Sequence, residues 1–154
     1  MTKLEIGDKA PKFKALDQEG KEVKSDDFKG KKLVLFFYPK ASTPGCTTEA
    51  KNLRDNYTEF LEKGYAIIGV SADSAKRQQN FITKNELPFP LLADEDKKVI
   101  EAFGVWGPKK FMGREYDGIH RTTFVIDEKG KIDNIIKKVK TKEHANQILC
   151  ATNK

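Results

Sequence analysis

The chain has 154 residues, which suits one domain, so we expect residues 1–154 to form a single domain around its own apolar core. Its 29 Lys and Arg residues exceed its 23 Asp and Glu residues by only six, and this mild, dispersed excess does not indicate nucleic-acid binding. The longest apolar run, residues 33–38, is far shorter than the ~20 residues of a membrane helix, and the first ten residues lack the apolar segment of a secretory signal.

The first half of the chain alternates short apolar runs with turn-forming residues, and each run is typical of a β-strand. The strands expected there span residues 13–16, 22–24, 33–38 and 65–71. The first two flank Gly20 and predict an N-terminal hairpin, whereas the continuously apolar third and fourth are typical of strands buried on both faces. Pro39 ends the third strand, and a helix over residues 44–63 should connect it to the fourth.

The second half of the chain continues this alternation and then closes with a hairpin and a helix. Helices are expected over residues 74–85, 97–103 and 141–150, and strands over residues 91–92, 122–127 and 131–139. Between them, residues 104–120 contain four glycines and a proline, which predicts a long loop. Loops of that length usually carry function.

The order of these elements indicates an α/β fold. Buried strands that alternate with helices favour parallel pairing, and the closing hairpin adds antiparallel strands, so the central β-sheet should be mixed and flanked by helices. Strand, helix, strand, two hairpin strands and a closing helix is the thioredoxin-like order. Here it carries an N-terminal hairpin extension and an inserted segment.

The chain contains two cysteines, Cys46 and Cys150, and two histidines, His120 and His144. Two cysteines cannot form a disulfide framework or a four-thiolate zinc site, and the spacing of the four residues matches no zinc motif. We therefore expect a reduced, cytoplasmic chain with no metal and no cofactor. His144 is expected at the surface.

Candidate chemistry concentrates where the strand of residues 33–38 passes into the next helix. Thr43 and Pro44 suit the N-cap and first position of that helix, which places Cys46 in its first turn. Unsatisfied N–H groups and the helix dipole favour an anion there, and the thiolate is the reactive form of cysteine. A buried structural cysteine is an equal alternative on this evidence, but α/β proteins place their sites at the carboxyl ends of strands, which favours a reactive one.

The residues around Cys46 also resemble a known family. The pattern Pro39-x-x-x-Thr43-x-x-Cys46 is similar to the peroxiredoxin signature Pro-x-x-x-Thr-x-x-Cys. Further segments resemble the bacterioferritin-comigratory, or Q-type, subfamily: residues 7–13, 36–47, 104–107 and 118–127. The resemblance extends from about residue 4 to residue 150 and implies a thiol-dependent peroxidase that reduces hydrogen peroxide and organic hydroperoxides.

The resemblance implies three central catalytic residues. Cys46 would attack the terminal peroxide oxygen and become a sulfenic acid. Thr43 would hydrogen-bond the thiolate and the bound peroxide, and the permanent charge of Arg121 would stabilise the thiolate and the oxygen charge that develops as the O–O bond breaks.

Three further residues would complete the site. Pro39 would pack over the sulfur, Glu49 would orient the arginine, and the backbone N–H groups of Gly45 and Cys46 would hold a peroxide oxygen. Each site residue also has an ordinary structural explanation, such as a helix cap, a strand end, a partner of the helix dipole or a surface charge. Their joint occurrence favours the functional interpretation.

The recycling step lacks its usual cysteine. Many Q-type relatives carry a resolving cysteine five residues after the peroxidatic one, where this chain has Lys51, and others carry it in the following helix, where residues 80–85 contain none. Cys150 lies at the edge of the apolar face of the last helix, and we interpret it as structural, with a two-cysteine cycle as the alternative. We expect an external thiol, from thioredoxin, glutaredoxin or glutathione, to reduce Cys46.

Two other function classes stay open. A thiol–disulfide oxidoreductase on the same fold would usually carry Cys-x-x-Cys, but Thr43 and Glu49 stand three residues to either side of Cys46. A catalytically idle binding module would be expected to have lost Thr43, Cys46 or Arg121, and none is lost. We expect no nucleic-acid or membrane partner, and a monomer or weak homodimer.

Overall fold

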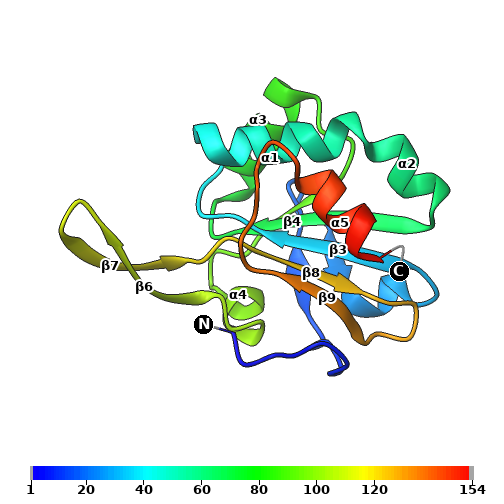
Figure 1. Ribbon diagram of the computed structural model, residues 1–154. Coiled ribbons are helices and arrows are strands. Elements are labelled where there is room, and N and C mark those ends of the chain that lie inside the picture. The colour runs from blue at the N-terminus through cyan, green and yellow to red at the C-terminus, as the bar shows by residue number, and fades with distance from the viewer. Residues whose placement is uncertain (1, 153–154) are drawn as a thin grey trace.

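The computed structural model describes residues 2–152, apart from the side chains of residues 111 and 150–152. Its central layer is a five-stranded sheet in the order β5-β4-β3-β8-β9 (Figure 1). These strands are β3 (Lys32–Phe37), β4 (Tyr65–Ser71), β5 (Leu91–Ala93), β8 (Thr122–Ile126) and β9 (Ile132–Ile136). β3, β4 and β5 pair in parallel, whereas β8 pairs antiparallel with both β3 and β9. The expected mixed sheet is therefore confirmed.

Helices cover both faces of this sheet (Figure 1). One face carries α1 (Pro44–Asp55), α2 (Tyr57–Glu62), α3 (Ala75–Asn85) and α5 (His144–Thr152). The other face carries the short α4 (Lys98–Ala102) and the N-terminal segment. Among the described residues, no helix combines the length and the apolar character that crossing a membrane requires.

The apolar run in β3 explains why both faces are covered. Successive side chains of a strand point to opposite faces, so Val34 and Phe36 pack toward α1, α3 and α5, while Leu35 and Phe37 pack toward α4. All four are fully buried. Burial of each such side chain contributes roughly 1.5–3 kcal/mol, which makes β3 the centre of two apolar cores.

The N-terminal hairpin is confirmed. β1 (Lys14–Leu16) pairs antiparallel with β2 (Glu22–Lys24), and the short 3-10 helix η1 (Ser25–Phe28) follows. Asp17 closes the turn, because its Oδ1 accepts hydrogen bonds from the backbone N–H groups of Glu19 (2.8 Å) and Lys21 (3.0 Å).

The prediction of one continuous helix over residues 44–63 is wrong, because the helix is divided at Asn56 into α1 and α2. The side-chain amide of Asn56 donates to the carbonyl of Asn52 (2.8 Å), which a regular helix would offer to the backbone N–H of residue 56. That N–H bonds Leu53 instead (3.2 Å). The apolar face continues across the break, since Leu53 and Phe60 are both fully buried.

The prediction of a long loop over residues 104–120 is also wrong. Most of it forms a hairpin, β6 (Trp106–Phe111) and β7 (Arg114–Ile119), that projects from the body of the molecule (Figure 1). Met112 (φ 51°) and Gly113 (φ 80°) form its turn, and positive φ at both central residues is what tight hairpin turns require. Gly107, Pro108 and Gly118, which helped to predict a loop, lie within the strands, where cross-strand pairing overrides their propensity.

The last strand and the last helix have bounds that differ from the predicted ones. β9 stops at Ile136 rather than residue 139, and α5 begins at His144 rather than residue 141. Gln147 holds the intervening residues away from the sheet, because its amide donates to the Lys138 carbonyl (3.0 Å) and its oxygen accepts from the Lys140 N–H (2.9 Å).

Candidate active site

The turn between β3 and α1 carries the predicted nucleophile. The backbone N–H of Tyr38 still donates to β4 (3.1 Å), and Pro39, which has no N–H, then ends the pairing. Thr43 has the extended N-cap conformation and Pro44 opens α1. Cys46 therefore lies in the first turn of α1, as the sequence predicts, and its side chain is buried.

A buried polar network fixes this turn from behind. The Asp73 carboxylate, which follows β4, accepts hydrogen bonds from the Ala41 N–H and the Ser71 hydroxyl, both at 2.7 Å. Gln78 on α3 donates to the same hydroxyl (2.8 Å) and accepts from the Tyr38 hydroxyl. Sequence reasoning missed this network, since its members are ordinary polar residues on three separate elements and only the fold brings them together.

Arg121 joins the predicted nucleophile to the predicted carboxylate. One guanidinium nitrogen donates to the Cys46 Sγ (3.2 Å) and another to the Glu49 Oε1 (2.6 Å). Glu49 lies one turn after Cys46 on α1 and is fully buried, while Arg121 comes from the connection between β7 and β8. A Cβ at Gly45 would lie 3.2 Å from the same guanidinium, so the glycine leaves room for the close approach.

Burial and the neighbouring charges both shift the pKa values of Glu49 and Arg121. Burial raises the pKa of Glu49 from 4.5 to about 7, against the lowering effect of Arg121. Burial also lowers the pKa of Arg121, but the charges of Glu49 and Cys46 outweigh it, so the net shift is upward and the guanidinium stays charged. Lys109 lines the same hollow as Arg121. Its pKa is lowered mainly by partial burial and, to a smaller extent, by repulsion from Arg121.

Thr43 and Pro39 border the site without touching the sulfur through a hydrogen bond. The Thr43 hydroxyl donates to the Lys40 carbonyl (2.9 Å) and does not cap α1. Pro39 and Trp106 line a hollow of about 410 Å³ between the active-site turn and the β6–β7 hairpin. The structure therefore groups Cys46 with Gly45, Glu49 and Arg121. Pro39 lines the neighbouring hollow, and the Thr43 hydroxyl bonds the Lys40 carbonyl rather than the sulfur.

The C-terminal helix carries Cys150 and His144. The backbone of Cys150 lies in α5, but its side chain is outside the described part of the chain. His144 was expected at the surface, and this is wrong, because its side chain is fully buried and its Nε2 lies 3.4 Å from the Glu49 Oε2. The only sequence signal was a glutamine one turn later, Gln147, whose Oε1 lies 2.9 Å from the His144 Nδ1.

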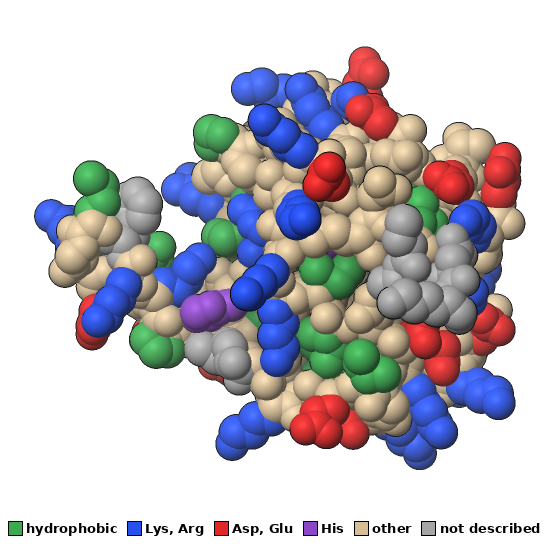
Figure 2. Space-filling model, viewed as in Figure 1, with side chains coloured by type: hydrophobic (Ala, Val, Ile, Leu, Met, Phe, Trp, Pro, Cys, Tyr) green, Lys and Arg blue, Asp and Glu red, His purple; other side chains and the backbone are tan. Residues whose placement is uncertain are grey.

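Positive charge gathers beside the site. A hollow of about 480 Å³ is lined by Arg121 together with Lys109, His120, Lys137 and Lys138. Figure 2 shows Lys and Arg side chains collected around a histidine on this face, next to the projecting hairpin. This hollow therefore presents a positive surface to an approaching anion.

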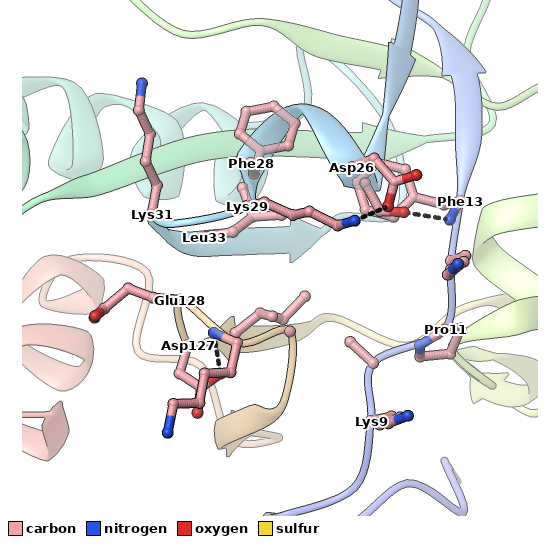
Figure 3. Close-up of a pocket in the computed structure, with 16 residues that line it drawn as sticks. Lys9, Pro11, Phe13, Asp26, Phe28, Lys29, Lys31, Leu33, Asp127 and Glu128 are labelled. Atoms are coloured by element: carbon pink, nitrogen blue, oxygen red, sulfur yellow. Dashed lines mark hydrogen bonds and ion pairs between the residues drawn. The ribbon is translucent and has the colours of Figure 1, made fainter.

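A largely apolar pocket lies away from the chemistry. Figure 3 shows this pocket of about 380 Å³, with Phe13, Phe28 and Leu33 among its apolar lining. Leu33 is near the start of β3, whereas Cys46 follows its end, and a strand of six residues is about 20 Å long. No residue of the predicted site lines this pocket.

Comparison with known proteins identifies the family. The model of the AhpC/TSA family matches residues 6–135. Peroxiredoxin Bcp of Escherichia coli is 48% identical over 149 residues, covering 97% of this chain and 96% of the relative. Peroxiredoxin Bcp of Bacillus subtilis is 49% identical over 146 residues, covering 95% of this chain and 93% of the relative.

Solved structures give the same result. A cysteine-to-serine variant of peroxiredoxin Q from Xylella fastidiosa superposes with a TM-score of 0.92 at 29% identity, covering 99% of this chain and 98% of that one. A cysteine-to-serine variant of peroxiredoxin Q from Xanthomonas campestris gives 0.86 at 37% identity, covering 92% and 90%. The thioredoxin-like fold expected from the order of elements is confirmed. The chain belongs to the AhpC/TSA family, and within it to the peroxiredoxins of the Bcp and Q type.

Proposed function

We propose that Cys46 is the peroxidatic cysteine of this thiol-dependent peroxidase and that Arg121 activates it. The observation that carries the proposal is the guanidinium that donates to the Cys46 Sγ and the Glu49 Oε1 at the first turn of α1. A permanent charge and a helix N-terminus both favour the thiolate, which is the nucleophilic form. Glu49 acts as a positioning residue, since it holds the guanidinium in place.

The reaction is a displacement at oxygen. The Cys46 thiolate attacks the terminal oxygen of a hydroperoxide ROOH, an S–O bond forms and the O–O bond breaks, giving the sulfenic acid and RO⁻, which takes up a proton as ROH. Arg121 and the N–H groups of Gly45 and Cys46, which belong to the first turn and have no intrahelical acceptor, face the negative charge that develops on oxygen.

Thr43 and Pro39 serve the substrate in this proposal. Because the Thr43 hydroxyl gives its proton to the Lys40 carbonyl, its lone pairs are free to accept a hydrogen bond from the peroxide O–H. Pro39 lines the hollow beside the β6–β7 hairpin, and in this proposal it limits water near the sulfur. Both roles depend on a substrate that enters between the active-site turn and the β6–β7 hairpin.

Family membership implies a hydroperoxide substrate and a thiol reductant. We propose that the reductant is an external thiol, such as thioredoxin, glutaredoxin or glutathione, acting in the cytoplasm on a monomer or weak homodimer. The external thiol would attack the Cys46 sulfenic acid, release water and form a mixed disulfide, and a second thiol would then restore Cys46. Organic hydroperoxides are included because alkyl peroxide reduction is described for the similar bacterioferritin comigratory protein of Xanthomonas campestris.

The test is a single-turnover assay of peroxide consumption without reductant. Cys46→Ser should abolish consumption, because a hydroxyl fits the same position but ionises too weakly to attack. Cys150→Ser removes the other thiol as a matched control and should leave this first step intact. Appreciable peroxide consumption by folded Cys46→Ser protein would reject the assignment.

A further inference from the structure

Glu49 has one carboxylate oxygen that Arg121 does not use. Its Oε1 accepts from the guanidinium, but among the described residues its Oε2 has no hydrogen-bond partner and is buried. The His144 Nε2 lies 3.4 Å from this oxygen. A buried carboxylate oxygen without a donor is costly, so the neighbour that faces it needs an explanation.

The hydrogen bonds around His144 fix which ring nitrogen carries the proton. The Gln147 side chain is oriented by two backbone groups, because its Nε2 donates to the Lys138 carbonyl and its Oε1 accepts from the Lys140 N–H. The same Oε1 therefore accepts from the His144 Nδ1 at 2.9 Å. In the neutral ring the Nε2 is then an acceptor with a single lone pair, and both the Thr123 hydroxyl, 2.7 Å away, and the Glu49 Oε2, 3.4 Å away, lie near it. The hydroxyl can rotate, so a protonated Glu49 can donate to this lone pair instead.

The Glu49 Oε2 and the His144 Nε2 are thus two acceptors that face each other. They can approach favourably only if one proton lies between them, on either the carboxyl or the ring. Among the described residues, Arg121 is the one charged group that shifts the pKa of both Glu49 and His144. Cys46 and Lys109 also interact electrostatically with Arg121 or with each other. Without the proton, a Cys46 thiolate and a Glu49 carboxylate would share the single positive charge of Arg121 in a buried site.

We propose that His144 is a positioning residue for peroxide reduction, which shares one proton with Glu49 and so keeps the charge of Arg121 available to the Cys46 thiolate. This inference rests on the peroxidatic role of Cys46 proposed above. It gives a function to a buried histidine on α5 that the reaction otherwise does not use.

The protonation equilibria agree with this arrangement. Burial raises the pKa of Glu49 to about 7 and lowers the pKa of His144 to about 4, so the proton resides on the carboxyl near neutral pH. As the pH rises through about 7, the proton leaves and Glu49 becomes an anion. Arg121 then pairs more strongly with Glu49, so less of its charge is available to the Cys46 thiolate and to the oxygen charge that develops as the O–O bond breaks. The second effect lowers the rate per thiolate.

The experiment follows the rate of Cys46 oxidation by hydrogen peroxide against pH, divided by the thiolate fraction from ultraviolet absorbance. For the wild-type protein this rate should fall by about tenfold around the titration of Glu49, a factor equivalent to one pKa unit. Glu49→Gln keeps the acceptor for Arg121 and offers a neutral amide to His144, so its profile should lack the step. His144→Gln places an amide donor against Oε2, which favours the anion and should lower the rate below pH 7 by about the same factor.

The double variant tests whether His144 acts through Glu49. The His144→Gln change should lower the rate in the wild-type background but have little effect in the Glu49→Gln background. An equal loss in both backgrounds would show a merely structural role and overturn the proposal, as would a wild-type profile without the step. Peroxide consumption by Cys46→Ser would instead reject the proposed function, so the two failures are distinguishable.

A spectroscopic measurement covers the case in which His144→Gln does not fold. Infrared difference spectra of wild-type protein against Glu49→Gln should show a protonated carboxylic acid band at pH 6 that disappears as the pH rises through about 7. Absence of that band at pH 6 would overturn the proposal without reference to activity.

Discussion

Replacing Glu49 by glutamine should change how the stability of this peroxiredoxin depends on pH. The carboxyl is fully buried, and burial raises its pKa from 4.5 to about 7 although Arg121 opposes the shift. The folded protein therefore binds this proton more tightly than the unfolded chain does. The resulting stabilisation is fully present below pH 4.5 and is lost as the pH rises through about 7.

The size of the effect follows from these two values. A window of about 2.5 pH units, at about 1.4 kcal/mol for each unit, gives about 3 kcal/mol. His144 works in the opposite direction, because burial lowers its pKa from 6.5 to about 4, and its contribution is present above pH 6.5 and lost as the pH falls through 4. Between pH 4.5 and 6.5, the contributions of Glu49 and His144 to the pH dependence of the free energy of unfolding have opposite signs and cancel in the wild-type protein. In the Glu49→Gln variant only the contribution of His144 remains.

Urea unfolding at a series of pH values measures this directly. The free energy of unfolding of the wild-type protein minus that of Glu49→Gln should fall by about 3 kcal/mol between pH 4.5 and pH 7, since the contributions of the groups that do not interact with Glu49 cancel. Asp133→Asn removes an exposed carboxylate on β9 and controls for the change in net charge. A difference that stays constant over this range would refute the reasoning about Glu49.

Three further changes test the site and the core. Arg121→Lys keeps the charge but not the fork that reaches Cys46 and Glu49 together, so stopped-flow measurement should show the peroxide rate falling by on the order of tenfold or more; a wild-type rate would contradict the role of the fork. Asp73→Ala leaves the Ala41 N–H and the Ser71 hydroxyl without their acceptor and should lower the free energy of unfolding by roughly 1–3 kcal/mol, which an unchanged urea midpoint would exclude. Gly69→Ala would place a Cβ 2.6 Å from Leu91 and 2.7 Å from Phe36, and we expect overpacking to cost about 1–3 kcal/mol in the same assay; an unaltered stability would show that the core can yield there.

The parts of the fold that the sequence predicts are those with a local signal. The continuous apolar run before Pro39 predicts β3 and its burial on both faces, and Thr43-Pro44 predicts where α1 begins. The break at Asn56 has no such signal, because the apolar spacing continues through it and only a side-chain hydrogen bond to Asn52 interrupts the helix. The β6–β7 hairpin is likewise hidden, since Gly107 and the proline after it are typical of loops.

The same distinction holds for the site. The spacing around Cys46 and the resemblance to peroxiredoxins single out Glu49 and Arg121, and the structure brings all three together. His144 is invisible to such reasoning, because a single histidine at the start of a helix has no periodicity. Its place beside Glu49 depends on the docking of α5 against α1, where the Asn52 side chain accepts from the backbone of α5 (2.7 Å).

The position of α5 also bears on how Cys46 is recycled. His144 at the start of α5 lies against Glu49, and Figure 1 shows the helix running from there away from the start of α1. Cys150 is six residues further on, which is about 9 Å along a helix axis. A disulfide needs Cα atoms within about 7 Å, and reduction of Cys46 by an external thiol stays the proposal to be tested.

Cys150→Ser should therefore keep most of the peroxidase turnover supported by an excess of external thiol, because the sulfenic acid at Cys46 is reduced through a mixed disulfide. The measurement is steady-state peroxide consumption, with mass spectrometry of both cysteines after one equivalent of peroxide. The competing two-cysteine cycle requires the first turn of α1 to unwind and the end of α5 to fray, which are low-stability openings in many proteins. A trapped Cys46–Cys150 peptide pair, together with lost turnover in Cys150→Ser, would decide for that cycle.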